Sequence, residues 1–96
     1  DLILEVEGID ATWLGPSDMA LSMGLPGKDH VKEHLDLVVN KTIERKKIAA
    51  ATHSGTDQFD EYEHFHSLGA RVLSITSLSL LKDSALDWQQ KIRQIK

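Results

Sequence analysis

The sequence predicts an α/β fold in which three short parallel strands alternate with helices. Apolar segments of strand length alternate with amphipathic segments of helix length, and a glycine ends a helix just before a strand at Gly8-Ile9 and again at Gly69-Ala70. This order is typical of βαβ units with right-handed crossovers. Such units build doubly wound sheets and (β/α)₈ barrels alike. The length of 96 residues favours a single partial domain, residues 1–96, that forms part of a barrel.

The N-terminal quarter contains a helix end, a strand and a short helix. The first helix is expected to stop at Gly8, and an apolar strand follows over residues 9–15. A short helix is expected over residues 17–23, and the glycines and proline of residues 24–27 mark a loop. Because Asp1 is not an initiator Met and the first residues resemble a helix already under way, we expect a fragment of a longer protein.

Two longer helices and a second strand follow. Asp29 is expected to cap a helix that runs to about Arg45, and a strand is expected over residues 48–52 because that segment is short and ends in a loop-like sequence. The next helix is expected to start near residue 56 or 57 and to end at Gly69. The apolar faces of these helices comprise Val31, Leu35, Val38 and Thr42 in the first, and Phe59, Tyr62, Phe65 and Leu68 in the second.

The C-terminal part predicts a third strand and a last helix. Residues 71–76 alternate between an aliphatic face and a small polar face, and we expect the small residues to point inward. In the last helix, apolar residues recur at spacings of three and four, which gives a narrow stripe like the a/d positions of a coiled coil. This stripe consists of Leu78, Leu81, Ala85, Trp88, Ile92 and Ile95.

Composition excludes several classes of function. The formal net charge of −4 argues against a nucleic-acid-binding surface, and no apolar run is long enough to span a membrane. The sequence has no cysteine, which excludes disulfides, thiolate metal sites and cysteine nucleophiles. We therefore expect a cytoplasmic protein with no nucleic-acid or membrane partner.

The strongest candidate for chemistry is Asp18, which follows the first strand after Gly15, Pro16 and Ser17. Residues just beyond the carboxyl ends of parallel strands build the ligand sites of α/β folds. Gly15 permits close backbone approach and Pro16 fixes φ, so the carboxylate and the neighbouring N–H groups are held in a set direction. The structural alternative is that Ser17 caps a short helix and Asp18 adds favourable charge to its first turn. A single carboxylate is not enough to hold Mg²⁺, and no second ligand is obvious.

Histidines and other acidic residues are weaker candidates. His53 lies just past the second strand, at the edge where catalytic residues gather, and histidine is the usual acid or base near neutral pH. A first-turn cluster on the following helix is interpreted as a solvated face and consists of Asp57, Asp60 and Glu61. The pairs His30/His34 and His64/His66 are interpreted as structural or surface residues.

Two segments resemble a known family. Residues 8–27, GIDATWLGPSDMALSMGLPG, resemble the signature of the HpcH/HpaI aldolase family, and residues 68–75, LGARVLSI, resemble the family's last helix-to-strand passage. The resemblance covers the whole chain and corresponds to the C-terminal part of the family. It implies the last three βα units of a (β/α)₈ barrel of the phosphoenolpyruvate/pyruvate type.

The resemblance also implies an activity. Family members are class II aldolases, in which a divalent metal ion such as Mg²⁺ or Mn²⁺ binds the carboxylate and keto oxygens of pyruvate. By motif position Asp18 is the second metal carboxylate, and the N–H groups near Ser17 and Asp18, in the segment that begins at Gly15 and Pro16, receive the pyruvate carboxylate. The first metal carboxylate, a glutamate, and the family's arginine and histidine would lie in an N-terminal part outside this sequence. Family barrels commonly exchange their eighth helix between subunits, which implies a homo-oligomer formed through the Leu78–Ile95 stripe. Packing of this helix on its own barrel is equally compatible with the sequence.

Two loops depart from the family pattern, and both departures bear on how the second half of the substrate would bind. Ser77-Leu78-Ser79 stands where an acidic residue is expected, and His53-Ser54-Gly55 is not typical. The leading hypothesis is an aldolase that cleaves 4-hydroxy-2-oxo acids to pyruvate and an aldehyde, with the 96-residue chain inactive by itself. The alternatives are a CoA-ester lyase of the citrate lyase β or malyl-CoA type, and a non-catalytic fragment or assembly module. The continuation at residues 22–27 favours the aldolases.

Overall fold

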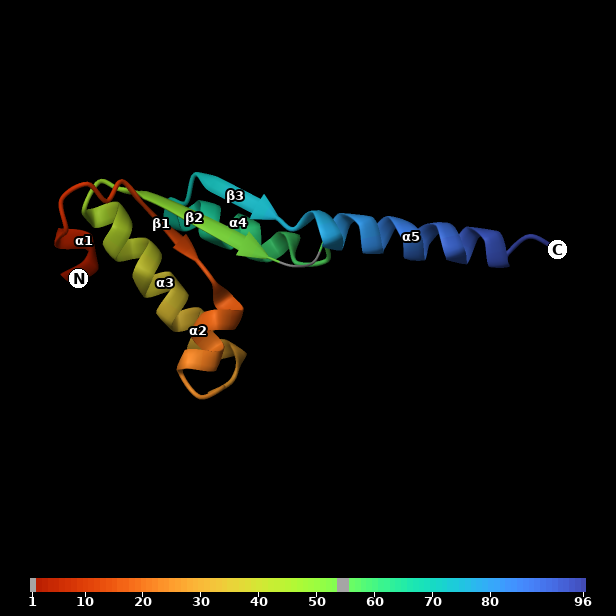
Figure 1. Ribbon diagram of the computed structural model, residues 1–96, viewed down its shortest axis with the longest axis horizontal. Coiled ribbons are helices and arrows are strands. Elements are labelled where there is room, and N and C mark those ends of the chain that lie inside the picture. Colours follow the sequence, from red (N-terminus) through yellow and green to blue (C-terminus); the bar gives the residue numbers. More distant parts are fainter. Residues whose placement is uncertain (1, 54–55) are drawn as a thin grey trace.

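The computed structural model describes residues 2–53 and 56–96, apart from the side chain of His53. Eight elements follow one another along this part of the chain (Figure 1). They are α1 (Leu2–Glu5), β1 (Ala11–Leu14), α2 (Pro16–Ser22), α3 (Lys28–Glu44), β2 (Ile48–His53), α4 (Phe59–Leu68), β3 (Val72–Ile75) and α5 (Ser77–Arg93).

The strands form one parallel sheet in the order β1-β2-β3. Trp13 of β1 is level with Ala50 of β2, and Ala50 is level with Val72 of β3. Sequential strands are thus neighbours joined by helical crossovers, and the predicted βαβ arrangement is confirmed. Because all three strands run the same way, their carboxyl ends meet at one edge of the sheet.

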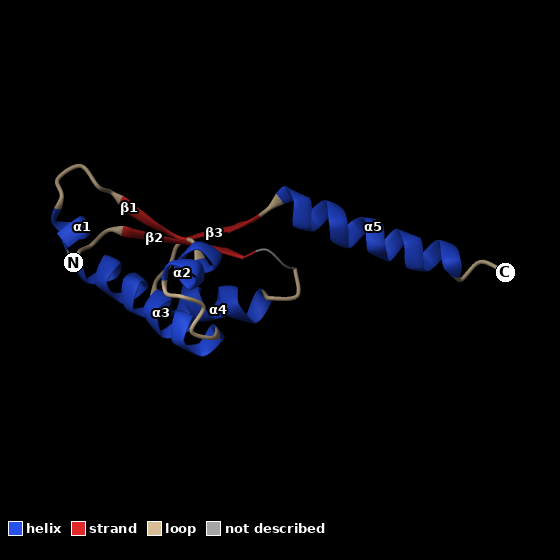
Figure 2. Cartoon of the chain, turned by 60° about the horizontal axis from the view of Figure 1, so that its bottom comes forward, coloured by secondary structure: helices blue, strands red, loops and turns tan. Residues whose placement is uncertain are grey.

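Helices α3 and α4 pack on one face of this sheet (Figure 2). Leu14, Ala49 and Ala51 point from the strands into this layer, where Val39 of α3 and Phe65 of α4 are almost completely buried. The small alanines let the helices approach the sheet closely, so the core is thin. Val31 and Leu35 complete it from α3.

One polar pair is buried within this layer. Thr42 of α3 is fully buried, and its hydroxyl donates a hydrogen bond of 2.7 Å to the carbonyl of Val38. A hydroxyl has a single proton, so the 2.9 Å bond between the Thr12 and Thr42 hydroxyls is donated by Thr12. This bond fixes α3 against β1.

The predicted elements are all present, but several boundaries differ. The cap of α3 is Gly27, with φ +104°, and Asp29 lies inside the helix, so its prediction as N-cap was wrong. Helix α4 starts at Phe59, later than predicted, after Gln58 as its N-cap. It ends at Gly69 in the left-handed conformation, as predicted. On α3 the buried residue is Val39, whereas the predicted Val38 is only half-buried.

Helix α5 leaves the sheet and projects away from it (Figures 1 and 2). The molecule is 62 Å long, and its radius of gyration is 16.7 Å, whereas a compact chain of this length has about 12.5 Å. None of the residues of α5, all of which are described, is buried. The predicted stripe on this helix is therefore open, and α5 does not pack on its own sheet.

Candidate functional site

The candidate site lies at the carboxyl edge of the sheet, where β1 turns into α2. Gly15 is the N-cap of α2 and Pro16 is its first residue, a position that tolerates proline because its N–H has no partner within a helix. Helix α2 therefore begins one residue before the predicted start, and Ser17 is not its cap. The N–H groups of Ser17 and Asp18 have no partner within the first helical turn.

The carboxylate of Asp18 folds back toward the end of the strand. A Cβ atom placed on Gly15 would lie 3.2 Å from Oδ2 of Asp18, closer than an ordinary contact. The φ of Gly15 is −115°, which other residues also adopt. A side chain at residue 15 would therefore require the Asp18 carboxylate to move by a few tenths of an ångström.

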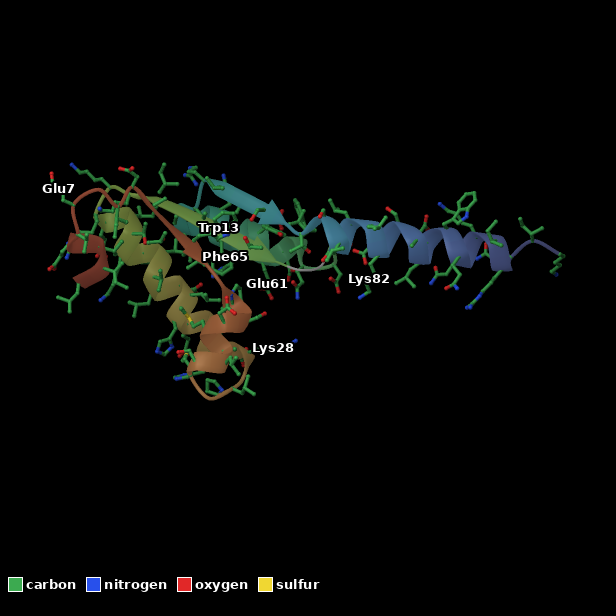
Figure 3. All side chains as sticks on the ribbon, in the orientation of Figure 1. Glu7, Trp13, Lys28, Glu61, Phe65 and Lys82 are labelled. Atoms are coloured by element: carbon green, nitrogen blue, oxygen red, sulfur yellow. The ribbon has the colours of Figure 1, made fainter. Side chains whose placement is uncertain are left out.

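An open cavity of about 970 Å³ surrounds this corner. The four residues predicted to form one ligand site, Gly15, Pro16, Ser17 and Asp18, all line it. The same cavity is lined by residues from the beginnings of α3 and α4, which the crossovers bring to the carboxyl edge. Figure 3 labels two of them, Lys28 on α3 and Glu61 on α4.

The charged residues of the cavity were not all recognised from the sequence. Asp29 and Glu61 add two carboxylates to that of Asp18, and Lys28 and Lys32 add two ammonium groups. Glu61 was interpreted as part of a solvated face. Glu61 lies in the first turn of α4, the helix that follows β2, and this turn is at the same sheet edge as Asp18. That position is the signal from which the sequence could have assigned Glu61 to the site.

A divalent metal fits this corner only in part. Asp18 is exposed and offers a hard oxygen ligand beside an open cavity, which suits Mg²⁺ or Mn²⁺. Across residues 2–53 and 56–96 there is no cluster of three or more metal-ligating side chains. Asp18 can therefore supply one ligand of a site whose other ligands must come from substrate, water or further protein residues.

His53 is the last residue of β2 and is level with Ile75 of β3. Its backbone is thus at the predicted edge, but its side chain lies outside the described residues, as do Ser54 and Gly55 of the following loop.

The other histidines have structural contacts. His30 and His34 contact each other with ring centroids 4.8 Å apart, and Nδ1 of His34 is 3.0 Å from the carbonyl of His30. Nε2 of His64 is 2.8 Å from Oδ1 of Asp36, which ties α4 to α3. These contacts agree with the structural interpretation of His30, His34 and His64, whereas His66 lines a second cavity.

A second cavity of about 650 Å³ lies between α4 and β3. Phe59, Tyr62, Leu73 and Ile75 give it an apolar lining, and Glu63 lies at its border. It is on the helix-covered face, beside β3, which is an edge strand of the described sheet. Thr56 and His66 also line this cavity, so its lining is largely but not wholly apolar.

Comparison with protein-family models gave no match for this chain, and comparison with curated protein sequences gave none either. Within the described residues, no helix combines the length and the apolar character needed to cross a membrane. The candidate site is thus defined by its own geometry.

Proposed function

We propose that this chain forms the last three βα units of a (β/α)₈ barrel of the HpcH/HpaI aldolase type. The parent protein would be a class II aldolase that cleaves 4-hydroxy-2-oxo acids to pyruvate and an aldehyde. One observation carries the proposal: Asp18 lies just past the carboxyl end of a parallel strand, in the first turn of α2 and beside an open cavity. The resemblance of residues 8–27 to the family signature is independent support.

The residues of this chain would have distinct tasks in such a reaction. A divalent metal bound at Asp18 would supply a positive charge next to the reacting oxygens. The N–H groups of Ser17 and Asp18 would orient the substrate carboxylate, because the start of a helix favours an anion. Pro16 restricts φ at the first residue of α2, which limits the conformations open to this corner when substrate binds.

The proposal extends to a homo-oligomer formed through α5. The Leu78–Ile95 stripe is exposed along the whole helix. The cavity between α4 and β3 has a largely apolar lining that includes Phe59, Leu73 and Ile75. Two exposed apolar surfaces favour association of α5 with the α4–β3 cavity of a second copy.

The test of the activity is pyruvate release by the parent protein from 4-hydroxy-2-oxo acids, with and without added Mg²⁺ or Mn²⁺. We expect metal-dependent release, and we expect Asp18→Asn to lower kcat/KM by at least about a hundredfold, because the substitution removes the charge of a metal ligand. Asp29→Asn is the matched control, since it removes the same charge from the same cavity. Its activity should stay within about threefold of wild type.

Three results would reject this function. Equal losses in the two variants would show that Asp18 has no special role. Absence of release from the hydroxy-oxo acids, with activity on CoA thioesters, would establish the lyase of the citrate lyase β or malyl-CoA type. Inactivity on both substrate classes would favour the assembly-module alternative.

A further inference from the structure

The face of the sheet opposite α3 and α4 carries an aromatic side chain in a fixed position. Within the described residues no helix covers this face (Figure 2). Trp13 points to it, because its neighbour Leu14 is buried in the helix layer and side chains alternate along a strand. The indole is 71% exposed, although tryptophan is usually well buried.

Hydrogen bonds across the sheet hold this indole in place. Nε1 of Trp13 donates to the hydroxyl of Thr52 on β2, and that hydroxyl bonds to the hydroxyl of Ser74 on β3, both at 2.5 Å. The hydrogen-bonded side chains of Trp13, Thr52 and Ser74 therefore join all three strands. Figure 3 labels Trp13 on β1.

The hydrogen bond to Thr52 limits the interactions that the indole can make with a ligand. Trp13 has a single polar hydrogen, and Thr52 already accepts it. The ring can then contact a ligand only through its π-face and its carbon edge. Those surfaces favour an aromatic ring or an aliphatic group over a hydrogen-bonding group.

Trp13 also belongs to the same cavity as Asp18. It lies two residues before Gly15 on β1, and it lines the cavity together with Asp18, Thr52 and Thr76. One side of this cavity is therefore charged and polar, and another is a flat apolar ring. A ligand that contacts both must have a polar end and an apolar end.

We propose that Trp13 is the apolar wall of this site and selects 2-oxo acids that carry an aromatic or bulky aliphatic group. The polar end of the ligand faces the Asp18 corner, and its apolar group stacks on the indole. Thr52 and Ser74 are positioning residues, since they hold the ring without contacting the ligand's apolar group. The inference rests on the proposed function for the identity of the polar end, and it adds the substrate class.

Calorimetric titration of the parent protein with pyruvate and with phenylpyruvate, both with Mg²⁺, tests the inference by binding alone. We expect phenylpyruvate to bind at least about tenfold more tightly, since added apolar contact in a pocket is worth this much or more. Trp13→Leu should reduce the preference to less than about threefold while changing pyruvate affinity little. Trp88→Leu is the matched control, because Trp88 is similarly exposed but lies on α5, and it should keep the full preference.

Thr52→Val keeps the indole but removes the acceptor of its hydrogen bond. We expect it to retain part of the preference, between the values of wild type and Trp13→Leu. Equal affinities of the two acids for wild type, or a preference that survives Trp13→Leu, would overturn the inference. The titration measures binding and no turnover, so the two proposals can fail separately. A failed aldolase assay with an intact Trp13-dependent preference would reject only the proposed function. A successful aldolase assay without that preference would reject only this inference.

Discussion

Helices α3 and α5 have the same length of 17 residues, and both are amphipathic, yet they have opposite environments. Helix α3 buries Val31, Leu35, Val39 and Thr42 against the sheet, whereas α5 buries nothing. The difference follows from their connections. Helix α3 joins β1 to β2, so it must return to the sheet, whereas α5 follows β3, an edge strand of the described sheet, and projects away from it. An apolar stripe thus specifies that a helix needs a partner, and the topology determines which partner is within reach.

The largest expected effect comes from shortening matched leucines in the two helices. Leu35→Ala on α3 should lower the free energy of unfolding by about 2–5 kcal/mol, because it leaves a cavity in the core. Leu81→Ala on α5 should change it by no more than about 0.5 kcal/mol in dilute solution, where the side chain is exposed. Urea denaturation followed by circular dichroism measures both values. Similar losses in the two variants at low protein concentration would contradict the contrast between the helices.

A smaller effect is expected from charges placed in the α5 stripe. Leu81→Glu combined with Trp88→Glu should raise the dissociation constant of the proposed oligomer by at least about a hundredfold, equal to about 2.7 kcal/mol. Light scattering during size-exclusion chromatography would report the lower mass. Leu86→Glu is the control, because Leu86 is exposed on the same helix but lies outside the stripe. If the double variant keeps the mass of wild type, α5 is not the interface.

The smallest effect is expected at the contact between α3 and the end of α4, a kind of contact that α5 lacks. A Cβ atom on Gly69 would lie 3.1 Å from Cγ1 of Ile43, and the φ of Gly69 is +113°. Gly69→Ala should therefore cost about 1–2 kcal/mol from backbone strain and crowding. Gly24→Ala tests the strain alone, since φ is +76° there and its Cβ would meet nothing within 4 Å. Thermal unfolding of the two variants should place Gly69→Ala lower, and the opposite order would argue against a tight α3–α4 contact.

The sequence predicted local structure well wherever periodicity and terminal residues agreed. The left-handed Gly69, the buried Phe65 and the parallel strands all follow from spacing and from glycine placement. The caps of α3 and α4 were predicted less well, because aspartate is a good cap and also a good first-turn residue. Only the backbone around Gly27 and Gln58 distinguishes these two roles.

At the candidate site, the sequence indicated the residues contributed by one segment but not those contributed by others. Gly15 to Asp18 are adjacent in the chain, so their shared role could be predicted. Glu61 and Thr52 reach the same cavity from other elements, and their proximity depends on the crossovers. The hydrogen bond from Trp13 to Thr52 spans 39 positions and has no local signal.

The amino-acid sequence by itself determined the order of helices and strands, the stripe on each helix and the carboxylate after β1, because these depend on residues within a few positions of one another. The tertiary structure decided that α5 projects from the sheet, that Thr52 and Glu61 reach the cavity beside Asp18, and that the Trp13 indole is hydrogen-bonded on the open face of the sheet. These features depend on which surfaces remain after the strands have paired. Periodicity along the chain specifies a face to be covered, whereas the free energy of burial depends on the surface that covers it.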